Sequence, residues 1–233
     1  ILYYMTNCTV LGSCRQAFMN NSFIQPDISY PHYTKEILQL IKYCKYGETV
    51  VKQKETNYTF RTPILHNKEL EYSDKISSEF NNTDIFLIEI ASKIVYKYQH
   101  LYLHHIAHDQ HYKSCSNIKN DIITYNQDYN EIETDILEIK KELGGKPFII
   151  VSHMVTKYEG ERYKLSCWLE EICTKYDIPF INPMKEIHEK HNITDEEIPK
   201  LFSPNEKTFN HLSGVGINYM RTIYKDKINI ILA

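Results

Sequence analysis

The chain has 233 residues, of which 42% are hydrophobic and 24% are charged, and its formal net charge is -3. This composition is ordinary for a globular protein, with neither the basic stripe of a nucleic-acid-binding protein nor an acidic disordered tail. No apolar run approaches the ~20 residues that a membrane-spanning helix needs. We therefore expect no nucleic-acid partner and no membrane association.

The six cysteines are scattered along the chain without a Cys-x-x-Cys pair. This spacing indicates neither a zinc knuckle nor a disulfide framework, so we expect a reducing, cytoplasmic compartment. The many Tyr, Asn, Lys and Ile residues are typical of an AT-rich genome, such as that of a large DNA virus or a protist; for a virus, the compartment would be the host cytoplasm. Because the chain begins with Ile1 and enters an apolar segment at once, we expect residues 1–233 to be a single domain cut from a longer polypeptide.

Apolar runs and helical periodicity predict the elements of the first half of the chain. We expect a strand over 1–11, a short helix over 15–20, a loop over 20–31, a helix from residue 34, β-rich runs over 49–51 and 58–60, a helix over 68–80 and a buried strand over 84–92. The Tyr-rich segment 93–116 has no clear period, and we interpret it as an insertion that shapes a pocket.

The second half of the chain continues the alternation of helices and strands. We expect helices over 128–143, 159–176, 184–190, 195–201 and 215–224, and strands over 147–152, 178–182 and 228–232. Such alternation predicts an α/β fold: a doubly wound, three-layer α/β/α sandwich with a mainly parallel sheet.

One stretch near the start, residues 9–16, has the outline of a strand, a tight turn at Gly12 and a helix start. A helix start favours the thiolate form of a cysteine, which makes Cys14 a candidate nucleophile. Ser13 could be the nucleophile instead, although we expect its N–H or hydroxyl to belong to an oxyanion hole. Arg15, in the first helical turn, could hold a phosphate. The alternative is that Cys14 is an ordinary small buried residue at the end of a strand.

Further candidates lie where predicted strands and helices end. Thr34 is a candidate N-cap, which would place His32 and Tyr33 at a helix N-terminus that favours anions. Glu89 interrupts an apolar strand, and a carboxylate there must be paired, hydrogen-bonded or functional. Ser92 and His153 lie at the carboxyl ends of two buried strands, where the ligand crevice of an open α/β sheet is expected.

A rival cluster contains His104, His105, His108, Asp109 and His111. His104, His108 and His111 could share one helix face and bind zinc or iron there. The cluster lacks the His-Glu-x-x-His pattern, and a polar chain with 11 histidines forms such clusters by chance. We therefore predict that the protein needs no metal.

Three short blocks resemble the SGNH (GDSL-type) hydrolase superfamily. Gly12-Ser13-Cys14-Arg15 is similar to its first block, with Cys14 at the position of the nucleophilic Ser. The cysteine resembles a branch of capsular-polysaccharide acetyltransferases that use coenzyme A. Residues 32–39 resemble a second segment of such proteins, and residues 210–216 resemble the C-terminal block that carries the catalytic His, here His211. The Asp that usually precedes that His by three residues is replaced by Thr208.

The resemblance implies an SGNH-hydrolase-like, flavodoxin-like fold and an acetyltransferase that moves an acetyl group from acetyl-CoA to an amine or hydroxyl of a sugar, with a nucleotide-linked sugar as acceptor. Cys14 would carry the acetyl group, or would line the pocket while the acceptor attacks acetyl-CoA directly; His211 would be the base. Substrate or cofactor contacts would come from the polar residues of the second block: His32, Tyr33, Thr34, Glu36 and Gln39.

Two other functions stay open. The same residues could hydrolyse a carbohydrate ester, although Thr208 in place of the Asp disfavours water activation by a triad. The domain could also bind carbohydrate without catalysis. The resemblance to biosynthetic enzymes further implies fusion to another biosynthetic domain.

Overall fold

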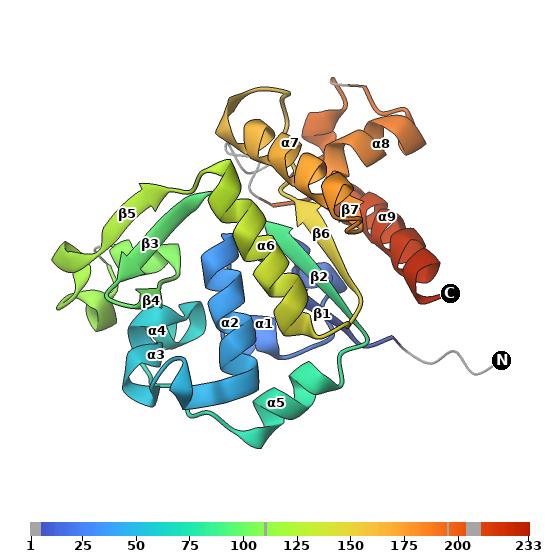
Figure 1. The fold of residues 1–233 in the computed structure, drawn as a ribbon. Coiled ribbons are helices and arrows are strands. Elements are labelled where there is room, and N and C mark those ends of the chain that lie inside the picture. The colour runs from blue at the N-terminus through green and yellow to red at the C-terminus, as the bar shows by residue number, and fades with distance from the viewer. Residues whose placement is uncertain (1–5, 110, 195, 204–210) are drawn as a thin grey trace.

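The centre of the molecule is a four-stranded parallel sheet (Figure 1). The structure is a computed structural model that describes residues 6–109, 111–194, 196–203 and 211–233. The strands are β1 (Cys8–Leu11), β2 (Ile85–Ile90), β6 (Phe148–Ser152) and β7 (Phe180–Ile181), and they lie side by side in that order. Their registers pair Leu11 with Ile88, and Glu89 with Val151. The mainly parallel α/β fold that the sequence predicts is thereby confirmed.

Helices cover both faces of this sheet. Alternate side chains of β2, such as Phe86 and Ile88, pack in one core with α2 (Thr34–Tyr46), α5 (Asp74–Asn81), α6 (Tyr129–Leu143) and α7 (Gly160–Lys175). The other side chains, such as Ile85 and Leu87, pack in a second core with α8 (Pro183–His191) and α9 (Gly214–Leu232). The described strands follow one another in chain order, so right-handed crossovers place the connecting helices on one face. The helices on the other face are therefore α8 and α9, which follow the last strand and do not connect two strands of the sheet.

The segment after β2 forms a small antiparallel sheet at the edge of the molecule (Figure 1). Its strands are β3 (Ile94–Tyr98), β4 (Leu101–Tyr102) and β5 (Ile123–Asn126), and the short 3-10 helices η3 (His105–His108), η4 (Lys113–Cys115) and η5 (Lys119–Asp121) lie between β4 and β5. The described part of the tyrosine-rich segment thus forms strands and short helices, and it brings β3 and η3 next to the ends of the parallel strands.

Two predicted β-rich runs are wrong. The region holds η2 (Gly47–Thr49), α3 (Gln53–Thr59) and α4 (Arg61–His66) instead. A backbone–side-chain pair starts α3, since the Lys52 N–H donates to the Glu55 carboxylate at 2.9 Å. Val51 and Phe60 are fully buried in the same core as α2. Packing against that helix therefore outweighs the local β propensity of the run. A short helix, α1 (Ile24–Asp27), also lies inside the predicted loop.

The predicted last strand is also wrong, because α9 continues through it. Tyr224 and Ile228 are one helical turn apart and are both buried on the sheet side, whereas Ile230 is 72% exposed. No glycine or proline separates the two halves of this helix. Elsewhere α6 begins after its N-cap Asp128 and ends at Gly144, whose φ is +62°, as the sequence predicts.

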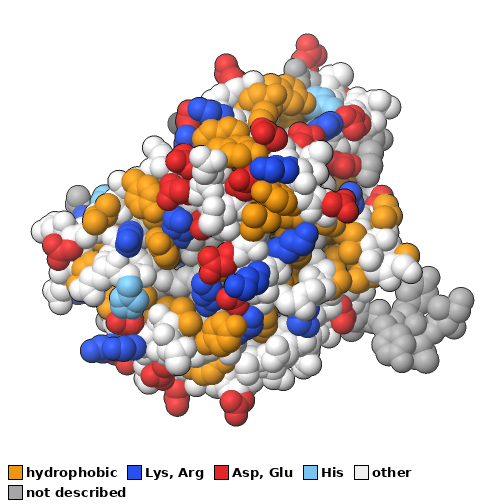
Figure 2. All heavy atoms as spheres, viewed as in Figure 1, with side chains coloured by type: hydrophobic (Ala, Val, Ile, Leu, Met, Phe, Trp, Pro, Cys, Tyr) orange, Lys and Arg blue, Asp and Glu red, His pale blue; other side chains and the backbone are white. Residues whose placement is uncertain are grey.

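The face that carries α2 and α6 has interleaved charges of both signs (Figure 2). Lys45 on α2 lies 2.7 Å from Glu142 on α6, and Lys42 pairs with Glu138 in the same way. This face therefore offers no extended patch of one sign. None of the described helices is long and apolar enough to cross a membrane.

Candidate active site

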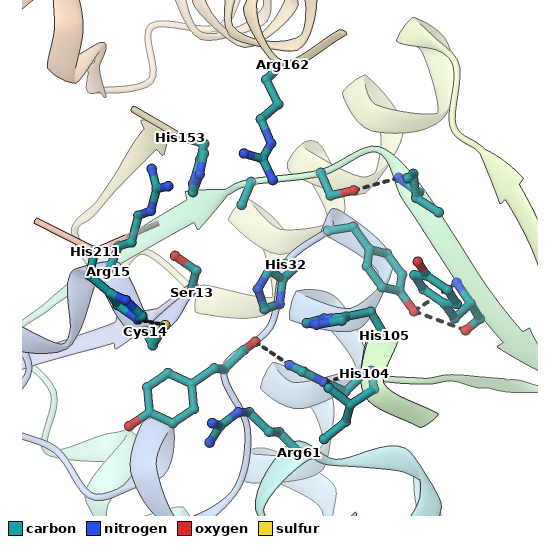
Figure 3. A pocket seen from close by; sticks show the side chains of 17 residues that line it. Ser13, Cys14, Arg15, His32, Arg61, His104, His105, His153, Arg162 and His211 are labelled. Atoms are coloured by element: carbon teal, nitrogen blue, oxygen red, sulfur yellow. Dashed lines mark hydrogen bonds between the residues drawn. The ribbon is translucent and has the colours of Figure 1, made fainter. Parts of the chain in front are cut away.

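A cavity of about 490 Å³ opens at the carboxyl ends of the parallel strands. Three strands place residues in its wall: Ser13 and Cys14 follow β1, Ser92 follows β2, and His153 follows β6. The antiparallel sheet and η3 close the opposite side with side chains that include Tyr96 and His105 (Figure 3). The ends of these three strands therefore face one cavity.

Cys14 and His211 meet at this cavity although 197 positions separate them. The Cys14 sulfur is exposed, and it lies 3.9 Å from Nε2 of His211. Cys14 is the first residue of η1 (Cys14–Met19), so the predicted strand, turn and helix start are present. A base beside a thiol is one arrangement by which a nucleophile can be activated.

The backbone around His211 is fixed by contacts with the segment before it. The His211 carbonyl accepts a hydrogen bond from the Ser203 N–H at 2.9 Å, and the Ser213 N–H donates to the Leu201 carbonyl at 2.8 Å. A Cβ at Gly216 would lie 2.1 Å from that same carbonyl oxygen, so only glycine fits there. The Ser-Gly-x-Gly part of the block therefore holds His211 in place. Thr208 and Asn210 lie outside the described residues.

Glu89 is the centre of a buried hydrogen-bond network beneath the cavity. Its Oε2 accepts from the Ser13 N–H at 2.8 Å and from the Ser13 hydroxyl at 2.5 Å. Its Oε1 lies 3.0 Å from the Gln16 amide nitrogen, which donates to it, and 2.8 Å from Nδ1 of His153. Tyr224 of α9 donates to Gln16 at 2.7 Å and so ties the network to the second helical layer.

The charge of Glu89 follows from these partners. Burial alone would raise its pKa, but His153 and the hydrogen bonds from Ser13 and Gln16 outweigh burial and lower the pKa to about 2. Burial also lowers the pKa of His153, and this effect outweighs the Glu89 carboxylate, which raises it. Glu89 is therefore ionised near neutral pH, whereas His153 is neutral and donates from Nδ1.

Ser13 has a structural role that its sequence position did not predict. Its N–H and its hydroxyl both point at Glu89, so Ser13 fixes the turn that carries Cys14. To act in an oxyanion hole, Ser13 would have to redirect one of these hydrogens, and that role stays a prediction. Arg15 lines the cavity and donates to the Met154 carbonyl at 3.2 Å, which connects η1 to the end of β6.

The second sequence block divides between the cavity and the core. His32 and Tyr33 line the cavity, whereas Thr34, Glu36 and Gln39 are buried away from its wall. Gln39 makes two hydrogen bonds to the backbone of Tyr102, at 2.7 and 2.9 Å. These contacts join α2 to β4.

The prediction that Thr34 is an N-cap is wrong. The N-cap is Tyr33, and the Thr34 hydroxyl donates to Asp135 of α6 at 2.6 Å. Glu36 accepts a hydrogen bond from the His32 N–H at 2.9 Å. A side chain of the helix itself is therefore the partner of a backbone N–H in the loop before the helix. Burial raises the pKa of Glu36 well above its usual value.

The histidine cluster differs from the one expected. His32, His104 and His105 lie together, with one ring nitrogen of each within 4.8 Å of the others. His108 and His111 do not join them, because the segment is a short 3-10 helix rather than an α-helix. His104 uses both nitrogens: Nε2 lies 3.1 Å from the Tyr30 carbonyl, and Nδ1 accepts from the Ile106 N–H at 3.3 Å. A metal ion there would require His104 to give up one of these bonds.

The cavity wall is rich in groups that bind anions. Within the described residues, it contains three arginines and five histidines but no Asp or Glu: Arg15, Arg61, Arg162, His32, His104, His105, His153 and His211. Arg61 stacks 4.8 Å from the Tyr30 ring centre, and in this same part of the chain neither Arg61 nor Arg162 has a carboxylate partner. Sequence analysis missed Arg61, since this residue directly follows a run that was predicted to be β. Arg162 could have been found, because it lies in the first turn of the helix that follows the strand before His153.

Comparison with protein-family models finds no matching family, and comparisons with curated proteins and with solved structures find no match.

Proposed function

We propose that this protein is an acetyltransferase that moves the acetyl group of acetyl-CoA to an amine or hydroxyl of a sugar. The acceptor class that we propose is a nucleotide-linked amino or deoxy sugar, used in the biosynthesis of a polysaccharide or glycan. The observation that carries the proposal is the thiol–imidazole pair of Cys14 and His211 at the wall of the cavity. The arginines in that wall support substrates that carry phosphates, as coenzyme A and nucleotide sugars do.

The chemistry begins with the thiol of Cys14. His211 Nε2 takes the thiol proton, and the thiolate attacks the carbonyl carbon of the acetyl thioester. The bond from that carbon to the coenzyme A sulfur breaks, and the departing thiolate takes the proton back from His211. Acetyl-Cys14 and free coenzyme A result. A distance of 3.9 Å between Sγ and Nε2 suits this proton transfer after a small approach of the two side chains.

The acceptor reacts in the second half of the cycle. Its hydroxyl or amine attacks the carbonyl carbon of acetyl-Cys14, the carbon–sulfur bond breaks, and the acetylated sugar leaves. In the direct alternative, the acceptor attacks acetyl-CoA itself, and Cys14 only lines the cavity. The two routes differ in whether acetyl-Cys14 forms.

Incubation with acetyl-CoA and a panel of nucleotide sugars, followed by mass spectrometry of protein and sugars, tests the proposal. Wild-type protein and a Cys167→Ala control, which replaces an exposed cysteine on α7, should acetylate a sugar. Cys14→Ala should not, and only the first two should carry an acetyl group on Cys14. Loss of the acetyl group to water would identify a hydrolase instead, and binding of sugars without turnover would identify a carbohydrate-binding domain.

A further inference from the structure

His153 lies in the cavity wall and has no part in the reaction so far described. It follows the last residue of β6, and its side chain is only 7% exposed. Nδ1 lies 2.8 Å from the Glu89 carboxylate. Nε2 is buried and has no hydrogen-bond partner among the described residues. A buried polar atom without a partner is uncommon in a folded protein and calls for an explanation.

The Glu89 contact decides which nitrogen of His153 carries the proton. A carboxylate only accepts hydrogen bonds, so Nδ1 carries the hydrogen and Nε2 keeps a lone pair. This is the tautomer that a carboxylate fixes in a catalytic triad, where Nε2 acts as the base. Because Glu89 lies below the wall and His153 lies in it, Nε2 is the nitrogen left to meet a ligand.

The same carboxylate also positions the nucleophile. Oε2 of Glu89 holds Ser13, the neighbour of Cys14, while Oε1 holds His153. One rigid group thus sets the turn that carries Cys14 and the imidazole that shares its cavity. Figure 3 shows Ser13 between Cys14 and His153, with Arg162 and Arg15 beside the imidazole. Both arginines disfavour a positive charge on His153, and neutral His32 lies across the cavity.

We propose that His153 is a second catalytic base, which binds the nucleophilic hydroxyl or amine of the acceptor at Nε2 and removes its proton during transfer. Glu89 is the positioning residue for this base. The inference rests on the proposed acetyl transfer and deepens it, because it assigns separate imidazoles to the two halves of the cycle: His211 to Cys14 and His153 to the acceptor.

The proton and bond balance of the second half is then complete. The acceptor's O–H or N–H bond breaks and its proton moves to Nε2 of His153, while its oxygen or nitrogen bonds to the acetyl carbon. The carbon–sulfur bond breaks and leaves the Cys14 thiolate. His153 releases its proton to solvent, and Cys14 takes one up from solvent, which restores the starting state.

The variant His153→Asn tests the two halves of the cycle separately, namely acetylation of Cys14 and transfer to the acceptor. Asparagine can keep a donor near the Nδ1 position for Glu89 but has no base. We expect acetyl-Cys14 to form from acetyl-CoA within about twofold of the wild-type rate, while its transfer to the acceptor slows by ~10²–10⁴. The acetyl-enzyme should therefore accumulate in the mass spectrum. His66→Asn, which replaces an exposed histidine on α4, should change neither half. Equal loss in both halves, or unchanged transfer, would overturn the proposal.

A second measurement does not depend on acetyl transfer. Nitrogen-15 NMR of the wild-type histidine rings, with His153 assigned from its loss in His153→Asn, reports the tautomer near neutral pH. We expect a neutral ring with the proton on Nδ1, and a ring protonated on Nε2 would overturn the inference. If the wild type forms no acetyl-Cys14 but shows this tautomer, the proposed donor or function is wrong. The inference that His153 can act as a base at Nε2 is then still supported.

Discussion

A Cβ placed on Gly12 would lie 2.6 Å from the Cβ of Glu89 and 3.3 Å from its backbone nitrogen. The two residues are neighbours across β1 and β2, one position beyond the pair formed by Leu11 and Ile88. The backbone of β1 therefore passes against Glu89 at the point where the chain turns toward Cys14. The close approach allows Glu89 to accept both hydrogen bonds from Ser13.

Gly12→Ala should therefore destabilise the fold by ~1–3 kcal/mol, the usual cost of forcing an extra methyl group into a packed site. The clash is with the Cβ and backbone of Glu89, which cannot rotate away. Chemical denaturation would measure the change in the free energy of unfolding. Gly214→Ala is the matched control: its Cβ meets nothing within 4 Å, so its effect should stay within about 0.5 kcal/mol. Equal stability of the Gly12 variant and the wild type would contradict the prediction.

Substitution of Cys14 or His211 should remove acetyl transfer rather than the fold. Cys14 is exposed, so Cys14→Ala should unfold like the wild type while turnover falls by several orders of magnitude, as is typical for loss of a covalent nucleophile. His211→Ala should be comparably damaging, and the double variant no worse than either single one, because the pair acts as a unit. Steady-state rates of all three variants test this. Near wild-type turnover by Cys14→Ala would mean direct attack by the acceptor.

Much of the sheet could be predicted because its strands are continuous apolar runs. Residues 84–92 and 147–152 are such runs, and both became central strands. The polar interruption at Glu89 was a true signal, since the carboxylate is held by three side chains and a backbone amide. The failures lie where tertiary packing overrides local preference, as in α3, α4 and the end of α9.

The site was predicted in outline but not in its contacts. Strand ends indicated Cys14, Ser92 and His153, because the carboxyl ends of parallel strands share one edge. No local pattern could show that the antiparallel insertion would bring His105 to His32, or that α4 would bring Arg61 to the same wall. Those contacts depend on long-range packing that a single sequence does not encode in its periodicity.

Removing one arginine of the cavity should weaken the binding of a phosphorylated donor. Arg162→Gln should raise KM for acetyl-CoA by roughly 10–100-fold, as expected for loss of a hydrogen bond to a charged group. With acetyl-pantetheine, a thioester that carries no phosphate, the variant and the wild type should have similar KM values. Arg221→Gln is the control, because Arg221 stacks over Phe18 and does not line the cavity. The same increase in KM with both thioesters would show that Arg162 does not bind the phosphates of acetyl-CoA.

Chelators should leave the activity unchanged. The three clustered histidines include His104, whose two nitrogens are both occupied by the protein backbone. Protein purified without a histidine tag should contain less than stoichiometric metal by elemental analysis, and its rate should survive dialysis against a chelator. Stoichiometric zinc or iron, with turnover lost to the chelator and restored by the metal, would contradict this prediction.

Acid should destabilise the fold well before most of the carboxylates titrate. Burial, with help from His105, lowers the pKa of His32 from 6.5 to about 3, and burial lowers the pKa values of His104 and His153 as well. Below about pH 6.5 the unfolded chain therefore binds protons at these positions that the folded chain does not. Stability is then complete above that pH and falls as the pH decreases toward the folded-state values. Glu89 adds to the loss only between about pH 4.5 and 2.

Thermal unfolding between about pH 7.5 and 5 measures this effect, because histidine side chains change charge in that range. Glu36 acts in the opposite sense, since burial raises its pKa and the folded chain keeps a proton there that the unfolded chain releases. The Tm should fall steadily as the pH is lowered. His32→Asn should flatten the slope, since it removes one buried group that resists protonation and whose Nδ1 has no partner among the described residues. His66→Asn, at an exposed position, should keep the wild-type slope. A His32→Asn variant that keeps the wild-type slope would show that this imidazole is not held neutral by the fold.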